Sequence, residues 1–447
     1  MNPLRFVSIV LALTSITALA ASADEPTTKP NAPQVRDLAE YRAKYPTVLT
    51  RHGPSPKIWQ STTPLNLPAG AKEVTFDSGP LKLKAWLSDA PRDGKLHPAV
   101  VYCHGGFWFG SEDWVAIKPL LDAGFIVMTP RWRGENGNPG EFELYYGEVD
   151  DVIAAGRFLA KADGVDTRRI FVCGHSAGAN LAAMAVMKDS PFALAAPIGA
   201  SLDIRGASQW KNERSKALIV FDPDNIHEVE SRSPLLFTAK MRAPVHLFQG
   251  SKDGDGVTPK NFVQLAHHFN RPATLTVVDG DHFQSQTTAM PKIVALFKDY
   301  APDRRVTLDL PDGWQRSQLP PNATAQQQIS NPTLRAYCQV FSESKDLFTA
   351  DVDVAGYAGL VKKATEQTTR LGKRRETDAE AGASEGVPYV TYDTTGFFQQ
   401  TDLHYRKFYV QTNHYFVQLV CWSTEADFNA ASAAMAQLIT KVREVSE

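Results

Sequence analysis

Residues 170–184 read Ile-Phe-Val-Cys-Gly-His-Ser-Ala-Gly-Ala-Asn-Leu-Ala-Ala-Met. The first four residues form a short apolar run, which is typical of a strand buried on both faces. The run after Gly178 is rich in strong helix formers. The Gly-x-Ser-x-Gly turn between them predicts a strained elbow that holds the Ser176 hydroxyl above the sheet. Gly174 and Gly178 fit this turn, because neighbouring backbone must pass where a Cβ would otherwise lie.

Strand-like and helix-like segments alternate on both sides of this elbow. A hairpin is predicted over residues 73–87. Further strands are predicted at residues 98–103, 125–129, 169–173, 193–200, 245–249 and 275–279, and helices at residues 114–123, 147–160, 259–268 and 291–300. This order predicts an α/β fold over residues 67–302, a mostly parallel sheet with helices on both faces. Residues 205–241 break the pattern, and we expect them to form a cap insertion beside the site.

The serine of the elbow has candidate partners further along the chain. A serine hydroxyl is a poor nucleophile unless a base takes its proton and an acid orients that base. In sheets of this type the acid and then the histidine follow later strands. Asp253 and His282 each follow a predicted strand. The sequence therefore predicts Ser176 as nucleophile, His282 as general base and acid, and Asp253 as the orienting carboxylate, with Asp255 as a competing acid.

Acyl transfer also needs two backbone donors for the negative charge that develops on the carbonyl oxygen. Ala177 follows the nucleophile and would supply one N–H group. The His-Gly-Gly motif at residues 104–106 follows a predicted strand, and the second donor would come from Gly106 or Phe107. Glycines in this loop allow a tight turn toward a substrate.

Two residues near these loops are candidates for a substrate pocket. Trp108 lies in an aromatic run with Phe107 and Phe109, which could floor a pocket or pack under the cap insertion. His175 occupies the variable position of the elbow, where it could face the pocket or pack locally.

The N-terminal residues predict export. Residues 1–23 are expected to be a secretory signal peptide. They contain a positive charge at Arg5, then a run of apolar or small residues, and finally the small residues Ala21-Ser22-Ala23 at a cleavage site. The run is short for a membrane anchor, so the mature chain is expected to be periplasmic or secreted, without a membrane span. Residues 24–66 are expected to form an arm that packs across the next domain.

Composition excludes several classes of partner. The formal net charge of −2 and the absence of a long basic run argue against nucleic acid. No Cys-x-x-Cys pair and no His-Glu-x-x-His motif occurs, so neither a metal nor another cofactor is predicted. The expected partner of the site is a small-molecule ester or peptide.

Residues 303–447 have a different pattern. Strands are predicted at residues 306–310, 334–341, 387–392, 403–411 and 415–422, and helices at residues 357–371 and 425–445. This order predicts a separate α+β domain. It holds no evident catalytic set, so we expect a binding module, docking an unknown partner in the cell envelope. Cys338 and Cys421 lie on two of its strands, and the sequence leaves open whether they form a disulfide. The basic cluster at Lys373 is interpreted as a solvated turn rather than a phosphate site.

Several motifs together resemble the α/β-hydrolase superfamily, on the branch shared by prolyl-oligopeptidase-type catalytic domains and dienelactone-hydrolase-like esterases. They are His104-Gly105-Gly106, Arg133-Gly134, Asp166-Thr167-Arg168-Arg169, Gly174-His175-Ser176-Ala177-Gly178, Gly250-Ser251-Lys252-Asp253 and Asp281-His282. The C-terminal domain is faintly similar to PsbP-type proteins in strand order.

The resemblance implies a serine hydrolase that cleaves a carboxylic ester through an acyl-enzyme, and the predicted signal peptide adds that it is exported. A peptidase of the prolyl-oligopeptidase type is the alternative, although no stretch of propeller size precedes residue 67. The loop around Asp253 is also a residue longer than usual for the family. A binding protein on a hydrolase scaffold is the alternative of another class, and the intact Ser176, Asp253 and His282 argue against it.

Overall fold

The computed structural model describes residues 34–56, 65–205, 216–254, 256–319, 325–348, 351–365, 372–398 and 401–446. The signal peptide expected at residues 1–23 lies outside these ranges. Contacts divide the described chain into a first unit that ends at Pro302 and a second unit that begins at Asp303. In the parts that the structure describes, none of the helices has the length and apolar character needed to cross a bilayer.

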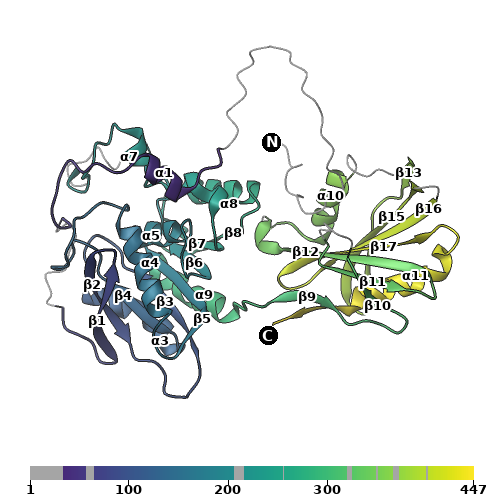
Figure 1. Cartoon of the computed structure of the whole chain (residues 1–447), viewed down its shortest axis with the longest axis horizontal. Coiled ribbons are helices and arrows are strands. Elements are labelled where there is room, and N and C mark those ends of the chain that lie inside the picture. Colours follow the sequence, from purple (N-terminus) through teal and green to yellow (C-terminus); the bar gives the residue numbers. More distant parts are fainter. Residues whose placement is uncertain are drawn as a thin grey trace, which may run out of the picture. The chain divides into compact units, whose positions relative to one another are not determined.

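The first unit is built on an eight-stranded sheet of order β1-β2-β4-β3-β5-β6-β7-β8 (Figure 1). Its strands are β1 Ala71–Ser78, β2 Leu81–Ser88, β3 His97–Cys103, β4 Ile126–Pro130, β5 Val165–His175, β6 Leu194–Ile198, β7 Val245–Gly250 and β8 Ala273–Val278. The predicted hairpin is confirmed as β1 and β2, which pair antiparallel. Strand β2 also pairs antiparallel with β4, and β3 to β8 pair in parallel. The predicted α/β class is thus confirmed.

Helices cover both faces of this sheet. They are α2 Ser111–Ala116, α3 Lys118–Asp122, α4 Glu148–Leu159, α5 Ala177–Ala185, α8 Val257–His268 and α9 Gln284–Asp299. Successive side chains of a strand point to opposite faces of the sheet, so neighbouring residues contribute to the two different hydrophobic cores. Val101 of β3 packs with α4, α5 and α8, whereas Val100 packs with α2, α3 and α9.

Two helix predictions differ from the structure. The helix expected over residues 114–123 is divided at Ile117, because Pro119 lies in the first turn of α3 and cannot donate a backbone hydrogen bond. The helix expected from residue 291 begins seven residues earlier, at Gln284. There Asp281 Oδ1 accepts from Phe283 N at 3.0 Å and Gln284 N at 2.9 Å, so an aspartate starts the helix and Pro291 is accommodated within it.

The N-terminal arm belongs to the first unit. Helix α1 Leu38–Lys44 begins at Asp37, whose Oδ1 accepts from Ala39 N at 2.9 Å. Leu38 is fully buried in the core that contains α4 and α5. The buried Arg42 donates to Tyr146 O at 2.8 Å and to Ser231 O at 2.9 Å. The arm is therefore anchored in the unit rather than a free linker.

The described part of the insertion carries α7 Ile226–Glu230 and the 3-10 helix η3 Pro234–Lys240. Its residue Phe221 forms a β-bridge with Leu49 of the arm. Arg232 is fully buried, and its guanidinium lies 2.6 Å from Glu228 Oε2. Trp210, which the sequence placed in this segment, lies outside the described residues.

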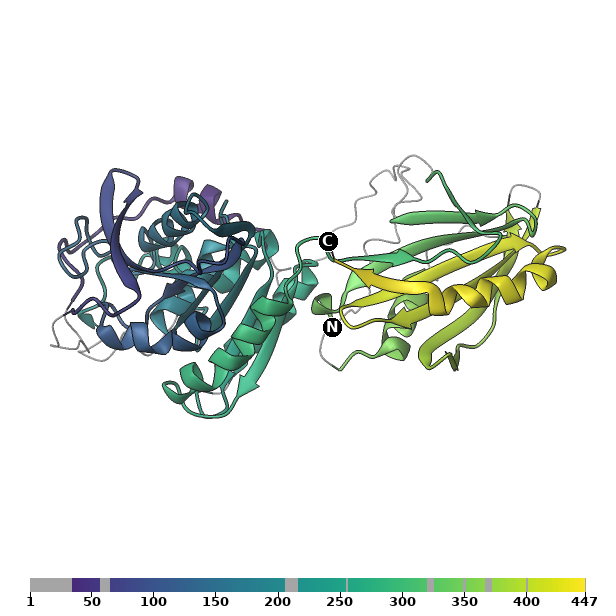
Figure 2. The ribbon, with the colours of Figure 1, turned by 90° about the horizontal axis from the view of Figure 1, so that it is seen from below.

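The second unit is α+β, as predicted. Its strands are β9 Arg305–Leu308, β10 Gln315–Ser317, β11 Gln327–Asn331, β12 Ala336–Ser344, β13 Gly372–Glu376, β14 Glu380–Ser384, β15 Val387–Phe398, β16 Thr401–Gln411, β17 Tyr415–Thr424 and β18 Val442–Val445. Its helical segments are η4 Lys345–Leu347, α10 Val354–Thr365, α11 Phe428–Gln437 and η5 Leu438–Lys441. The main sheet is antiparallel, in the order β10-β11-β12-β17-β16-β15-β13 with β14 on β15. Helices α10 and α11 belong to two different hydrophobic clusters of this unit. Figure 2 shows α11 running along the sheet.

Two features of this unit correct the sequence analysis, and a third answers a question that it left open. The helix predicted over residues 425–445 ends at Gln437, and β18 then pairs with β9, because β9 offers it an antiparallel edge. Strand β13 contains the basic cluster interpreted as a turn, and Arg374 forms an ion pair with Glu376 at 2.5 Å. Cys338 and Cys421 are both buried and do not form a disulfide. They lie opposite each other on the neighbouring strands β12 and β17.

Candidate active site

Ser176 lies at the predicted elbow, between the end of β5 and the start of α5. Its backbone is strained, with φ 55° and ψ −114°. A Cβ on Gly174 would lie 2.5 Å from Cys103 O, and one on Gly178 would lie closer still to the same oxygen. Both positions therefore require glycine, because the end of β3 passes so close to the elbow that a side chain would clash. The sharp turn places Ser176 at the carboxyl end of the sheet.

His282 lies between Ser176 and Asp253. Its Nε2 atom is 2.9 Å from Ser176 Oγ, and its Nδ1 atom is 2.9 Å from Asp253 Oδ2. These distances are within hydrogen-bond reach, as a nucleophile, a base and an orienting acid require. The side chain of His282 is 34% exposed, so a substrate could reach it. The competing acid, Asp255, lies outside the described residues.

Gly199 is a residue of this site that the sequence analysis missed. It follows β6 with a φ of +62°, a conformation that favours glycine. A Cβ here would lie 3.0 Å from Asp253 Oδ2 and 3.2 Å from His282 Nδ1. A glycine at the carboxyl end of a predicted strand was the only signal available, and many such glycines serve ordinary turns.

His175 is buried and contacts the backbone of the base. It is only 4% exposed, and its Nε2 atom donates to the backbone carbonyl of His282 at 2.7 Å. Ser285 Oγ donates to the same carbonyl at 2.8 Å. Burial lowers the pKa of His175 to about 4, so the ring is neutral and carries its hydrogen on Nε2. Of the two alternatives for His175, these contacts favour local packing.

The predicted oxyanion donors lie beside the elbow. Ala177 is the first residue of α5, so its N–H group has no acceptor within the helix. The loop after β3 passes close by, because a Cβ on Gly105 would lie 3.8 Å from Ser176 Cβ. Gly106 has a φ of +67° and turns this loop. The side chain of Phe107 packs against Phe142, with ring centroids 5.5 Å apart.

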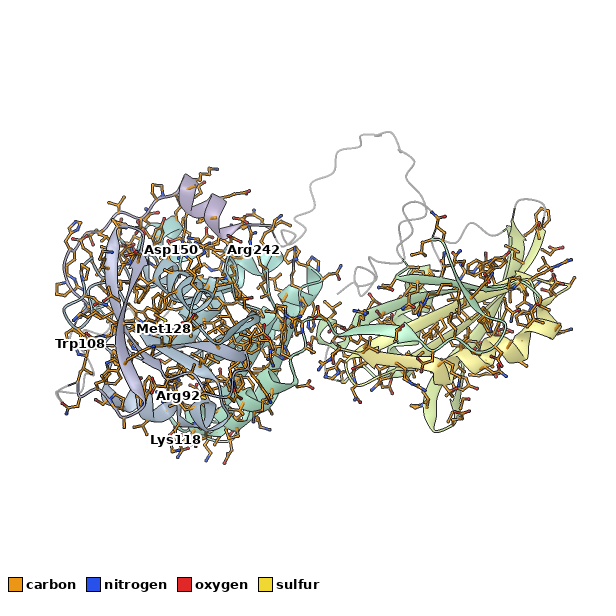
Figure 3. The ribbon with its side chains drawn as sticks, turned by 60° about the horizontal axis from the view of Figure 1, so that its bottom comes forward. Arg92, Trp108, Lys118, Met128, Asp150 and Arg242 are labelled. Carbon is orange, nitrogen blue, oxygen red and sulfur yellow. The ribbon has the colours of Figure 1, made fainter. Side chains whose placement is uncertain are left out.

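Trp108 lines a cavity whose lining includes none of the triad residues. The cavity has a volume of about 510 Å³, and its other lining residues are Arg51, His52, Pro54, Ser55, Pro56, Gly134, Gly137 and Asn138. Figure 3 shows Trp108 at the outer edge of the first unit, whereas Met128 lies in its middle. The arm therefore forms part of the wall of the cavity that Trp108 lines.

His104 begins the loop after β3 and is fully buried. Its Nε2 atom lies 2.9 Å from Glu135 Oε2, and its ring stacks on Trp132 with centroids 5.5 Å apart. Burial alone would lower the pKa of His104, but the charge and hydrogen bond of Glu135 outweigh it and raise the pKa to about 9. His104 is therefore a cation at neutral pH, paired with a buried carboxylate.

Within the described residues, no group of three or more His, Cys, Asp or Glu side chains is arranged to hold a metal ion.

Comparisons with curated proteins give partial relatives. The chain is 31% identical over 142 residues to an uncharacterized protein of Mycobacterium tuberculosis, covering 30% of this chain and 50% of that protein. It is 24% identical over 186 residues to an uncharacterized peptidase of Bacillus subtilis, covering 40% of this chain and 72% of that protein. The chain thus spans half the length of the first of these relatives.

Comparisons with solved structures give matches of low identity to about half of the chain. A puromycin-hydrolyzing peptidase of Mycobacterium tuberculosis has a TM-score of 0.45 at 21% identity, covering 51% of this chain and 38% of that one. An esterase of Pyrococcus furiosus has a TM-score of 0.44 at 20% identity, covering 55% of this chain and 99% of that one.

The comparison with family models covers more of the chain. The model described as "Alpha/beta hydrolase family" matches residues 100–437, which is more than half of the sequence. That range contains the elbow, the acid loop and the histidine loop described above. The chain therefore belongs to the alpha/beta hydrolase family.

Proposed function

We propose that the chain is a serine hydrolase that cleaves a carboxylic ester through an acyl-enzyme on Ser176. One observation carries this proposal: a continuous hydrogen-bonded chain in which His282 joins Ser176 Oγ and Asp253 Oδ2, each at 2.9 Å. A hydroxyl, an imidazole and a carboxylate in this order are the parts that activate a serine.

The proposed reaction follows from these contacts. His282 Nε2 takes the proton as Ser176 Oγ attacks the ester carbonyl, and the Asp253 carboxylate stabilises the imidazolium that forms. The N–H groups of Ala177 and of Gly106 or Phe107 would stabilise the developing oxyanion. His282 then protonates the leaving alcohol. A water molecule, deprotonated by the same imidazole, releases the acid and restores Ser176.

A serine-type peptidase is the second candidate. The curated relative in Bacillus subtilis is named a peptidase, and the match covers 72% of that protein. The same triad would serve both reactions, with an amine instead of an alcohol as the leaving group. The two candidates differ in the substrate that the site accepts rather than in the groups that act on it.

Labelling with a fluorophosphonate probe tests the common part of both candidates. We expect the wild type to be labelled and Ser176→Ala not to be labelled. Ser78→Ala is a suitable control, because it removes a serine hydroxyl that is buried and occupied with Asp151, at 2.6 Å, rather than with a histidine. A folded wild type that is neither labelled nor active would favour a binding protein on a hydrolase scaffold.

Substrate comparison separates the two candidates. We expect p-nitrophenyl acetate to be hydrolysed with a higher kcat/KM than aminoacyl-p-nitroanilides. The reverse order would favour the peptidase.

We further propose that the mature chain is exported and that the second unit docks a partner in the cell envelope. The signal-peptide pattern of residues 1–23 supports export. Fractionation of cells that produce the full-length chain tests this proposal, and retention of the protein in the cytoplasm would contradict it. Co-sedimentation of residues 303–447 with isolated envelopes tests the docking.

A further inference from the structure

The loop that would supply the second oxyanion donor is bound by a residue of the N-terminal arm. We call residues 104–109 the oxyanion loop. Ser55 is only 2% exposed, and its Oγ atom donates a hydrogen bond to Phe107 O. The backbone N–H of Ser55 donates to Gly134 O at 3.0 Å. A single arm residue thus joins the oxyanion loop to the loop after β4.

The loop after β4 binds the far end of the oxyanion loop. The side-chain amide of Asn136 donates to Phe109 O at 3.0 Å and accepts from Phe109 N at 3.2 Å. Both backbone groups of Phe109 are therefore satisfied by one side chain, in the manner of a strand partner. Asn136 itself adopts a φ of 47°, which asparagine tolerates better than most residues.

The same loop binds the near end. Glu135 is 1% exposed, and its Oε2 atom accepts from His104 Nε2 at 2.9 Å and from Trp132 N at 3.1 Å. The oxyanion loop is therefore tethered at its first residue by Glu135, in its middle by Ser55 and at its last residue by Asn136.

We propose that Ser55, Glu135 and Asn136 are positioning residues that hold the oxyanion loop in its reactive geometry, which makes the N-terminal arm part of the catalytic machinery. This inference rests on the proposed function. Its physical basis is that an oxyanion donor acts only when it lies about 2.7–3.1 Å from the developing charge. A loop with glycines at positions 105 and 106 loses much entropy when it is fixed, so it needs tethers to remain in one conformation.

The test compares three variants with a matched control. Ser55→Ala removes the hydroxyl that binds Phe107 O, and Ser55→Thr keeps it. Asn136→Gly removes the amide yet tolerates the positive φ. Ser88→Ala is the matched control, because it removes a buried hydroxyl that accepts from Val127 N at 2.9 Å, near the start of β4 and apart from the three tethers. For each protein, kcat and KM for p-nitrophenyl acetate, the rate of fluorophosphonate labelling and Tm are measured.

We expect Ser55→Ala and Asn136→Gly to lower kcat and the labelling rate by about ten-fold or more, because small misplacements of catalytic groups are costly. KM should change little, Ser55→Thr should recover most of the rate, and Ser88→Ala should keep it. Wild-type kcat in folded Ser55→Ala and Asn136→Gly, a change confined to KM, or an equal loss in Ser88→Ala would overturn the positioning roles alone. An unlabelled, inactive wild type would overturn the proposed function and the positioning roles with it.

Discussion

Gly199 gives the sharpest test of the site's geometry. Its α-carbon faces the contact between Asp253 and His282, with nothing but hydrogen on that side. Gly199→Ala would place a methyl group 3.0 Å from Asp253 Oδ2 and 3.2 Å from both Nδ1 and Cε1 of His282. The variant therefore perturbs the two partners of Ser176 without changing any of the three.

The size of the effect follows from these distances. A carbon–oxygen contact relaxes at about 3.4 Å, so the carboxylate or the ring must move by about 0.4 Å. A misplacement of about 1 Å can cost a hundred-fold in rate, so we expect kcat to fall by about ten-fold, or about 1.4 kcal/mol of barrier. The left-handed backbone adds a separate cost of about 1 kcal/mol to the free energy of unfolding.

A matched control separates the two effects. Gly124 has a φ of +86° and would carry a Cβ with no atom within 4 Å. Gly124→Ala should therefore lose a similar free energy of unfolding in urea and keep wild-type kcat for p-nitrophenyl acetate. If folded Gly199→Ala keeps the kcat of Gly124→Ala, the assigned Asp253–His282 contact is not needed for the reaction, and the reasoning is refuted.

Three further predictions concern stability and the independence of the first unit. Burial lowers the pKa of His175 from 6.5 to about 4, so the unfolded chain takes up this proton at the higher pH. The free energy of unfolding should therefore fall as the pH drops from about 6.5 to about 4, and urea titrations of His175→Gln should show a smaller fall. Glu228→Gln leaves the buried Arg232 guanidinium without its carboxylate and should lower the free energy of unfolding by about 3 kcal/mol in urea. Asp77→Asn, whose exposed carboxylate contacts Lys82 at 2.7 Å, should leave that energy unchanged, and an equal loss in both variants would contradict the argument. Truncation after Pro302 should leave a folded fragment that hydrolyses p-nitrophenyl acetate, and a folded but inactive fragment would show that the second unit contributes to the reaction.

The sequence predicted the parts of the fold that depend on residues close together in the chain. The strand before Ser176, its two glycines and the helix after it form one contiguous stretch, so the elbow could be read directly. Asp253 and His282 could be assigned because each follows a short apolar run, and parallel strands bring their carboxyl ends to one edge of the sheet.

Other parts depend on contacts between residues far apart in the sequence. Gly199 is required by side chains that follow it by more than fifty residues, so no local pattern marks it. Likewise, the role of His175 depends on the backbone of His282. Strands β10 and β11 carry too many polar residues for an alternating apolar pattern, and β18 becomes a strand only because β9 offers it an edge. These are tertiary effects that override local propensity.

The anchoring of the N-terminal arm has a consequence for synthesis. Arg42 binds a carbonyl 189 residues further along the chain, and Thr47 N binds a hydroxyl 99 residues further along. Helix α1 is therefore made long before Ser231, and the contact between Arg42 and Ser231 cannot form until the chain reaches that residue. A chain that stops before residue 231 would lack this anchor of the arm. Because Ser55 belongs to the same arm, its bond to Phe107 O would then lose part of its support.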